Sequence, residues 1–183
     1  FLVGNAGMVD PLKGYEVFLR TAHEVIHTRG HDHIGFIWVG AFGRGKQEEV
    51  HHLINTLHLQ DHVWFTGELE DPFPVFRMLD LFFLSSHEDS FPLVMLENAS
   101  LGNPVIAFRG TGGSGEFLKG YPELMIGDID PVQAAERIIQ FSHDPDSCRQ
   151  IGKDLKKRVM AHFTMDTCAA GYYRFVKQVM GDE

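Results

Sequence analysis

The sequence predicts an α/β fold, a doubly wound, Rossmann-like parallel sheet of about six strands with helices on both faces. Short apolar runs alternate with helical patterns along the chain, and this alternation is typical of successive β-α-β units. The chain has 183 residues, of which 44% are hydrophobic, so it can bury one core of single-domain size. We therefore expect a single domain over residues 1–183.

The predicted strands are six runs rich in Val, Ile, Phe or Trp, residues that favour an extended backbone. In chain order they are Phe1–Gly4, Gly35–Val39, His62–Thr66, Leu81–Leu84, Pro104–Phe108 and Leu124–Ile126.

Helical patterns fill the intervals between these strands and continue after the last one. Asp130 marks one clear start, because its side chain can cap a helix whose first residue, Pro131, has no N–H to leave unpaired. The predicted helices are Gly14–Thr28, Gln47–Leu57, Pro72–Leu79, Phe91–Leu101, a short turn at Gly115–Leu118, a helix from Pro131, Asp146–His162 and Met165–Met180.

Composition and charge exclude several classes of protein. A formal net charge of −9 argues against a nucleic-acid binder, which needs clustered Lys and Arg. Cys148 and Cys168 have no C-x-x-C spacing, so we expect free thiols in a reducing compartment. No apolar run approaches the ~20 residues that span a bilayer. The chain opens in an apolar strand without an initiator Met or a signal-peptide pattern, which suggests a cytoplasmic protein and a fragment of a longer one.

The eleven histidines do not predict a metal site. They cluster in polar helix ends and turns, and no H-E-x-x-H motif is present. The pair Asp128-Ile-Asp130 is better explained as a turn and a helix cap. The two clusters are His27, His31 and His33, and His51, His52, His58 and His62.

The segment from His87 to Glu97 carries the clearest functional signal. It places Asp89 and Glu97 around the start of a helix that follows a buried strand. The first turn of such a helix offers unpaired N–H groups and a positive dipole end, which suit phosphates. Glu97 lies among apolar neighbours, where a carboxylate needs a reason, and it can accept hydrogen bonds from ribose or sugar hydroxyls. The sequence therefore predicts a nucleotide-type ligand at the carboxyl ends of parallel strands.

Six short motifs, in this order and spacing, make the chain similar to one family. The chain resembles the C-terminal, nucleotide-sugar-binding domain of retaining GT-B glycosyltransferases, the glycosyl transferases group 1 family, over nearly its whole length. The family's central pattern is Glu, seven residues, Glu, and here Asp89 stands at the first position unless Glu88 takes the role out of register. The motifs are Lys13-Gly14, Trp38-Val-Gly40, Trp64-Phe-Thr-Gly67, Asp89 to Glu97, Gly102-Asn-Pro-Val-Ile106 and Thr111-Gly-Gly-Ser-Gly-Glu116.

The resemblance implies roles for particular residues. Lys13 would contact the donor diphosphate, Asp89 would lie near the transferred sugar, and Glu97 would hold the ribose hydroxyls. Gly40 would allow the backbone to approach the donor closely, and the loop with Phe65 and Thr66 would recognise the base. The helix start would present backbone N–H groups, with Pro92 in the first turn, where its missing donor costs nothing. That segment is Ser90, Phe91, Pro92, Leu93 and Val94.

One position departs from the family pattern. The family's phosphate clamp usually has an arginine six residues before the lysine, and Gly7 stands there. Three explanations stay open: the clamp is weaker, Arg109 or Lys119 substitutes from another loop, or catalysis has been lost.

The implied reaction is transfer of a hexose-type sugar from a nucleotide-diphosphate donor, such as a UDP-sugar, to an acceptor hydroxyl with retained anomeric configuration. The resemblance implies no metal or other cofactor. It also implies a missing N-terminal acceptor-binding domain, through which the protein could associate with membranes in polysaccharide biosynthesis. The isolated chain would then turn over little, because the cleft that orients both reactants is absent. The alternatives are a non-catalytic nucleotide-binding or scaffold domain, and half of a GT-B-like sugar-nucleotide epimerase.

Overall fold

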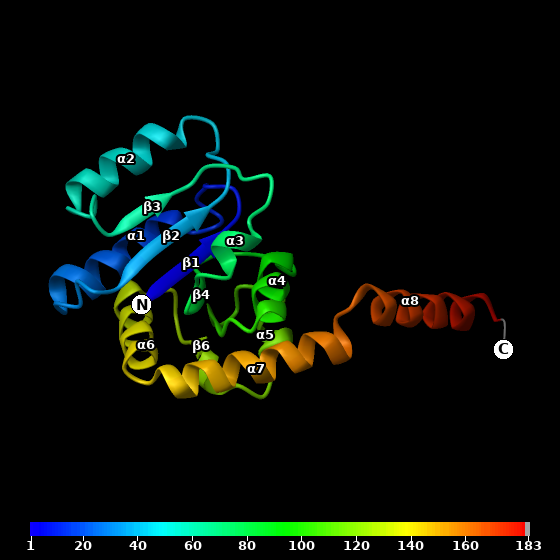
Figure 1. Cartoon of the computed structure of the whole chain (residues 1–183). Coiled ribbons are helices and arrows are strands. Elements are labelled where there is room, and N and C mark those ends of the chain that lie inside the picture. The colour runs from blue at the N-terminus through cyan, green and yellow to red at the C-terminus, as the bar shows by residue number, and fades with distance from the viewer. Residues whose placement is uncertain (182–183) are drawn as a thin grey trace.

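Six parallel strands form one sheet in the order β3-β2-β1-β4-β5-β6 (Figure 1), which confirms the predicted doubly wound fold. The computed structural model describes residues 1–181. The order reverses between β1 and β4, and this reversal is where doubly wound sheets bind their ligands. The strands are β1 (Leu2–Ala6), β2 (Gly35–Val39), β3 (Val63–Phe65), β4 (Leu81–Leu84), β5 (Val105–Phe108) and β6 (Met125–Ile126).

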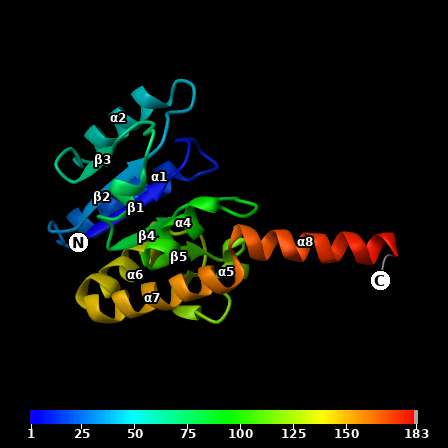
Figure 2. The same cartoon turned by 45° about the vertical axis from the view of Figure 1, so that its right-hand side comes forward.

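Helices cover both faces of the sheet. Helix α1 contacts both α2 and α6 in one layer, and α4 packs against α7 in the other (Figure 2). The helices are α1 (Tyr15–His23), α2 (Lys46–Thr56), α3 (Phe73–Phe76), α4 (Leu93–Leu101), α5 (Ser114–Phe117), α6 (Pro131–His143), α7 (Pro145–His162) and α8 (Met165–Met180), with a π turn at Glu24–Thr28 and a 3-10 turn at Pro122–Leu124.

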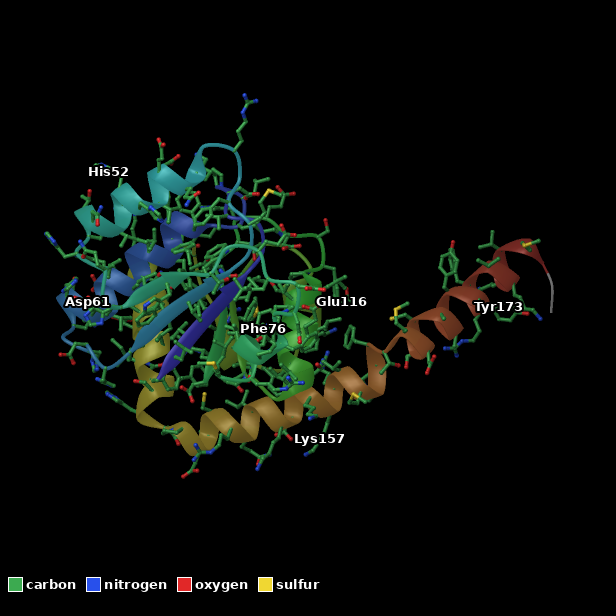
Figure 3. All side chains as sticks on the ribbon, turned by 45° about the horizontal axis from the view of Figure 1, so that its top comes forward. His52, Asp61, Phe76, Glu116, Lys157 and Tyr173 are labelled. Atoms are coloured by element: carbon green, nitrogen blue, oxygen red, sulfur yellow. The ribbon has the colours of Figure 1, made fainter. Side chains whose placement is uncertain are left out.

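Aromatic side chains of the helices and of the sheet meet in the core. Phe18 of α1 lies edge-on to Phe36 and Trp38 of β2, with ring centroids 5.5 and 5.2 Å apart, an arrangement that aromatic pairs favour. Phe76, at the end of α3, is 1% exposed, whereas Tyr173 of α8 lies outside the body (Figure 3). Burial of these rings fixes the strands whose ends make the site.

Several predicted boundaries shift for local reasons. The first strand runs to Ala6 rather than Gly4. The helix predicted from Phe91 begins at Leu93, because Pro92 has an extended backbone with ψ 112°. The helix predicted over Pro72–Leu79 contains only Phe73–Phe76, since the chain turns after it. Asp130 caps α6 as predicted, accepting a hydrogen bond of 2.9 Å from the Val132 amide.

Helix α8 projects away from the rest of the protein (Figures 1 and 2) and buries none of its residues. No helix in the described part of the chain has the length and apolar character needed to cross a membrane. Cys148 and Cys168 are both free thiols, as predicted.

Candidate functional site

A cavity of about 300 Å³ lies at the carboxyl ends of β1 and β2, on one side of the point where the strand order reverses. We call it the Glu97 cavity. Loops after β1, β2 and β3 form three of its walls, and α3 and α4 supply the rest. Its size is at the lower end of the range for small-molecule sites. The lining residues are Ala6, Gly7, Met8, Val39, Gly40, Ala41, Glu68, Leu69, Pro72, Phe76, Val94 and Glu97.

Backbone atoms bring three of these loops together. The Gly7 amide donates to the Val39 carbonyl at 2.9 Å, and the Gly40 amide donates to the Gly67 carbonyl at 3.0 Å. Gly40 has φ +149°, and a Cβ there would come within 2.0 Å of the Gly7 carbonyl oxygen. Only glycine fits this position. Gly40 thus allows a close approach between two protein loops at the cavity wall, and approach of its backbone to a donor stays a prediction.

Glu97 projects from α4 and lines the cavity. Its side chain is half-buried, and within residues 1–181 it forms no ion pair. A partly buried carboxylate without a protein partner is an acceptor available to a ligand hydroxyl.

Glu68 gives the cavity a second carboxylate, which sequence reasoning missed. It follows the Thr66-Gly67 turn directly, and its acidic character next to that turn was the available signal. The Glu97 cavity thus contains two carboxylates and no cationic side chain among its lining residues. Such a lining favours hydroxyl and amino donors over phosphate.

Lys13 and Asp89 form an ion pair across the reversal point, with Nζ and Oδ2 2.5 Å apart. Lys13 comes from the loop after β1 and Asp89 from the loop after β4. The two loops also meet through the His87 amide, which donates to the Leu12 carbonyl at 2.8 Å. The side chains are 31% and 14% exposed, so the ammonium is accessible while the carboxylate is mostly covered.

The backbone around Lys13 is tightly fixed. The Lys13 amide donates to Asp10 Oδ1 at 2.9 Å. The Ser85 hydroxyl bonds to the Gly14 carbonyl at 3.0 Å and accepts from Asn5 Nδ2 at 2.7 Å. Gly14 has φ +73°, and a Cβ there would approach the Ser85 carbonyl oxygen within 2.0 Å. These contacts fix the backbone from which the Lys13 side chain extends at the end of the sheet.

Asp89 is held from its other side by the loop after β5. Its amide donates to the Thr111 carbonyl at 2.8 Å, and its carbonyl accepts from the Gly113 amide at 3.2 Å. A Cβ on Gly112 would lie 1.9 Å from the Asp89 carbonyl oxygen. The Gly-rich segment from Thr111 therefore supports the Asp89 loop.

The residues from Ser90 to Val94 lie in different environments. Val94 lines the Glu97 cavity, and Leu93 is 67% exposed at the start of α4. Ser90 is exposed, and Phe91 packs against Phe163 with ring centroids 5.9 Å apart. Because α4 starts at Leu93, the amides of Ser90 and Phe91 precede the helix. Pro92 likewise stands before the first turn, which corrects its predicted place inside it.

Phe65 and Thr66 do not line the cavity. The Phe65 ring stacks with Trp38 and with Phe42, in each case at 5.8 Å. The Thr66 hydroxyl donates to the Gly67 carbonyl at 2.8 Å. The residues of this loop that reach the cavity are Glu68, Leu69 and Pro72 instead.

The histidine clusters bring rings together without a ligand set. His27 lies 5.4 Å from His23 and 6.2 Å from His62 between ring centroids. Its Nε2 also hydrogen bonds to the His58 carbonyl at 2.8 Å. Among residues 1–181, no group of three or more His, Cys, Asp or Glu side chains is placed to hold a metal ion.

Comparison with known families gives a match over most of the chain. Residues 1–144 match the model of a family described as "Glycosyl transferases group 1". The match covers all six strands and ends just after α6.

Curated relatives are similar at the sequence level. The N-acetyl-alpha-D-glucosaminyl L-malate synthase of Bacillus anthracis is 28% identical over 132 residues, which are 72% of this chain and 34% of that protein. A D-inositol 3-phosphate glycosyltransferase of Thermomonospora curvata is 27% identical over 152 residues, which are 79% of this chain and 35% of that protein. The chain thus spans about a third of the length of these relatives.

Solved structures share the fold. Anabaena Alr3699/HepE in complex with UDP superposes with a TM-score of 0.86 at 21% identity, over 97% of this chain and 49% of that one. The C-terminal domain of a glycosyl transferase group 1 family protein (LpcC) from Francisella tularensis gives a TM-score of 0.78 at 18% identity, over 90% of this chain and 87% of that one.

Proposed function

The chain belongs to the glycosyl transferases group 1 family, and from this premise we propose that it is the donor-binding part of a retaining, hexose-transferring glycosyltransferase. The donor is a nucleotide-diphosphate sugar and the acceptor is a hydroxyl group. One observation carries the proposal: the Glu97 cavity and the Lys13–Asp89 pair lie at the same edge of the sheet, around the point where the strand order reverses. Doubly wound sheets bind nucleotides at this place.

The chemistry of the cavity fits the nucleoside half of the donor. Glu97 has no protein partner among the described side chains and can accept hydrogen bonds from both ribose hydroxyls. Apolar walls from Leu69, Pro72 and Val94 suit the faces of a base. Phe65 would then support the site indirectly, because its ring stacks on Trp38 and Phe42 rather than on the base. Thr66 and Gly67 set the course of the loop that carries Glu68.

Lys13 is the cation proposed for the diphosphate. Negative charge grows on the leaving diphosphate as the bond to the sugar breaks, and a fixed ammonium stabilises that charge. The amides at the start of α4, those of Leu93 and Val94, would add to it. No metal ion is part of this proposal, since these groups supply the counter-charge.

The ion pair suggests how diphosphate binding and sugar placement are linked. Asp89 neutralises Lys13, with Oδ2 and Nζ 2.5 Å apart. A diphosphate carries more charge than one carboxylate, so it competes for the ammonium and releases Asp89. The released carboxylate is then free to accept a hydrogen bond from a hydroxyl of the transferred sugar. This exchange ties donor binding to placement of the sugar.

Gly7 supports a second candidate, a domain that binds nucleotide without turnover. A Cβ on Gly7 would lie 3.8 Å from the side-chain carbons of Lys13, so an arginine at this position would stand next to the lysine. With glycine there, Lys13 is the single cation of the pair that the family uses. Binding of a nucleotide is common to both candidates, and sugar transfer occurs only in the first. Arg109 and Lys119 line a separate pocket, which shares no residue with the Glu97 cavity.

The acceptor side is proposed to lie in the part of the protein that corresponds to the remaining two thirds of the relatives. The names of two relatives contain L-malate and D-inositol 3-phosphate, and these differing names give no single acceptor to test first. The Anabaena protein has been solved with UDP and with UDP-glucose. Uridine donors are therefore the first to test.

Calorimetric titration with UDP, GDP, ADP and their glucose conjugates tests the proposal. We expect one base to bind, and Glu97→Gln to weaken that binding at least tenfold, because the uncharged amide accepts weaker hydrogen bonds from ribose (about 1.4 kcal/mol). Glu48→Gln, an exposed change on α2, is the matched control. Binding of every nucleotide with equal strength in both variants would contradict the assignment.

Turnover separates the two candidate functions. With the complete protein and a bound donor, we expect Lys13→Ala to reduce sugar transfer by two or more orders of magnitude, as for loss of a charge-stabilising donor. A protein that binds donor but transfers or hydrolyses no sugar, with Lys13 intact, would favour the non-catalytic candidate.

A further inference from the structure

A second hollow at this end of the sheet carries positive charge. Its volume is about 390 Å³, compared with about 300 Å³ for the Glu97 cavity. Arg109 directly follows β5, Lys119 lies just after α5, and both line the hollow. We call it the Arg109 pocket. Arg109 and Thr111 belong to the same loop, and the Thr111 carbonyl accepts a hydrogen bond from the Asp89 amide. The pocket therefore adjoins the Asp89 loop.

The two cations have no acidic partner in the described part of the chain. Within residues 1–181, neither Arg109 nor Lys119 forms an ion pair, and no Asp or Glu is among the lining residues. The chain as a whole has a net charge of −9. Two cations without an ion-pair partner that line the same hollow favour the binding of anions there.

Backbone donors add to this charge. Gly110 and Gly120 both line the pocket, with φ of +76° and +97°. In the described part of the chain, neither amide donates to a backbone oxygen, although the amides of Arg109 and Tyr121 next to them do. Both glycines are exposed, so these amides are open to a ligand as well as to solvent, and glycine turns with free N–H groups form concave anion sites. The pocket therefore combines two cations with two available amides.

We propose that the Arg109 pocket binds a phosphate-bearing small molecule. Arg109 would pair with two phosphate oxygens through its planar guanidinium, and Lys119 would act as a point charge. The Gly110 and Gly120 amides would donate to the same group. The volume exceeds what a bare phosphate needs, which leaves space for an organic part. This proposal is independent of the donor site, because the two hollows share no lining residue.

Amide NMR on the isotopically labelled chain tests the proposal. The chain is titrated with inorganic phosphate, glycerol 3-phosphate and glycerol at constant ionic strength. We expect saturable shifts of the Gly110 and Gly120 amides with a phosphate compound and none with glycerol. A response to inorganic phosphate means that the phosphate group suffices, and a response to glycerol 3-phosphate alone means that the organic part is needed. Both support the proposal.

Two double variants complete the test. We expect Arg109→Gln with Lys119→Gln to weaken phosphate binding by about tenfold or more. Arg77→Gln with Lys156→Gln removes the same residue types from exposed positions outside the pocket and should leave binding unchanged. Unshifted amides of residues remote from the pocket verify that each variant is folded. Absence of shifts with every phosphate compound, equal affinity in both double variants, or shifts centred on Lys13 would overturn the proposal.

Discussion

Helices α7 and α8 follow one another in the chain, yet only α7 is part of the packed body. They have 18 and 16 residues, and side chains of Asp144 and Thr164 cap their starts. Helix α7 buries Leu155 and Val159 and lies so close to α4 that a Cβ on Gly152 would meet the Gly102 carbonyl oxygen at 1.8 Å. Helix α8 buries nothing and projects away from the body.

The difference illustrates that local capping signals and tertiary packing are separate features of a helix. An isolated helix of this length is marginal in water, because nucleation is costly and packing supplies most of the stability. The body ends at Phe163, whose ring contacts Phe91 and Phe117 at 5.9 and 5.3 Å between centroids. The proposed donor site lies entirely on the body side of this residue.

Truncation of an apolar side chain to Ala should affect the free energy of unfolding far more in α7 than in α8. Leu155→Ala in α7 should lower the free energy of unfolding by about 2–5 kcal/mol, because it leaves a cavity in a fully buried position. Phe175→Ala in α8, where the ring is 61% exposed, should change it by less than about 0.5 kcal/mol. Urea unfolding measures both. Similar losses from the two changes would show that α8 packs on the body in solution.

Two glycine substitutions should change stability in opposite directions, one in the body and one in α8. Gly40→Ala should destabilise the body by about 2–4 kcal/mol, because φ is +149° and the new Cβ overlaps the Gly7 carbonyl oxygen. Gly171→Ala lies in the middle of α8 with no atom near its Cβ position. It should increase the helicity of α8, with a gain up to about 1 kcal/mol. Thermal unfolding and circular dichroism follow the two effects, and a stable Gly40→Ala chain would contradict the structure of the cavity wall.

A difference in reactivity between the two cysteines also separates α7 from α8. Burial raises the pKa of the Cys148 thiol in α7 to about 12, and its Sγ donates to the Asp80 carbonyl at 3.4 Å. A raised thiol pKa means less of the reactive thiolate at any pH below it. Cys168 in α8 is exposed. At a pH of about 8 we expect iodoacetamide to modify only Cys168 in the native chain and both cysteines in denaturant. Equal native rates at the two residues would contradict the burial of α7.

Local sequence patterns predicted most of the fold. Apolar runs located all six strands, and Asp130 with Pro131 located the start of α6, because these signals come from neighbouring residues. The start of α4 was displaced, since sequence alone did not show that Pro92 adopts an extended backbone. The sequence also did not predict that α8 projects away from the body, because the capping and periodicity of α8 resemble those of a packed helix.

The site was predicted in part for the same reason. Sequence motifs point to Lys13, Asp89 and Glu97, and the structure brings the first two into contact and places the third in the cavity. Glu68 was missed and Phe91 turned out to face Phe163, because both positions depend on contacts between segments distant in the sequence. Tertiary contacts, rather than local propensity, decide which residues of a motif face a ligand.

Amide NMR can locate a bound nucleotide on the chain. Amide shifts are recorded while UDP, or whichever nucleoside diphosphate binds in calorimetry, is added to saturation. The donor-site proposal predicts the largest shifts at Gly7, Gly40 and Val94 and at Lys13, with α8 unaffected. Shifts confined to α8 or to the Arg109 pocket, with those four residues unchanged, would contradict it.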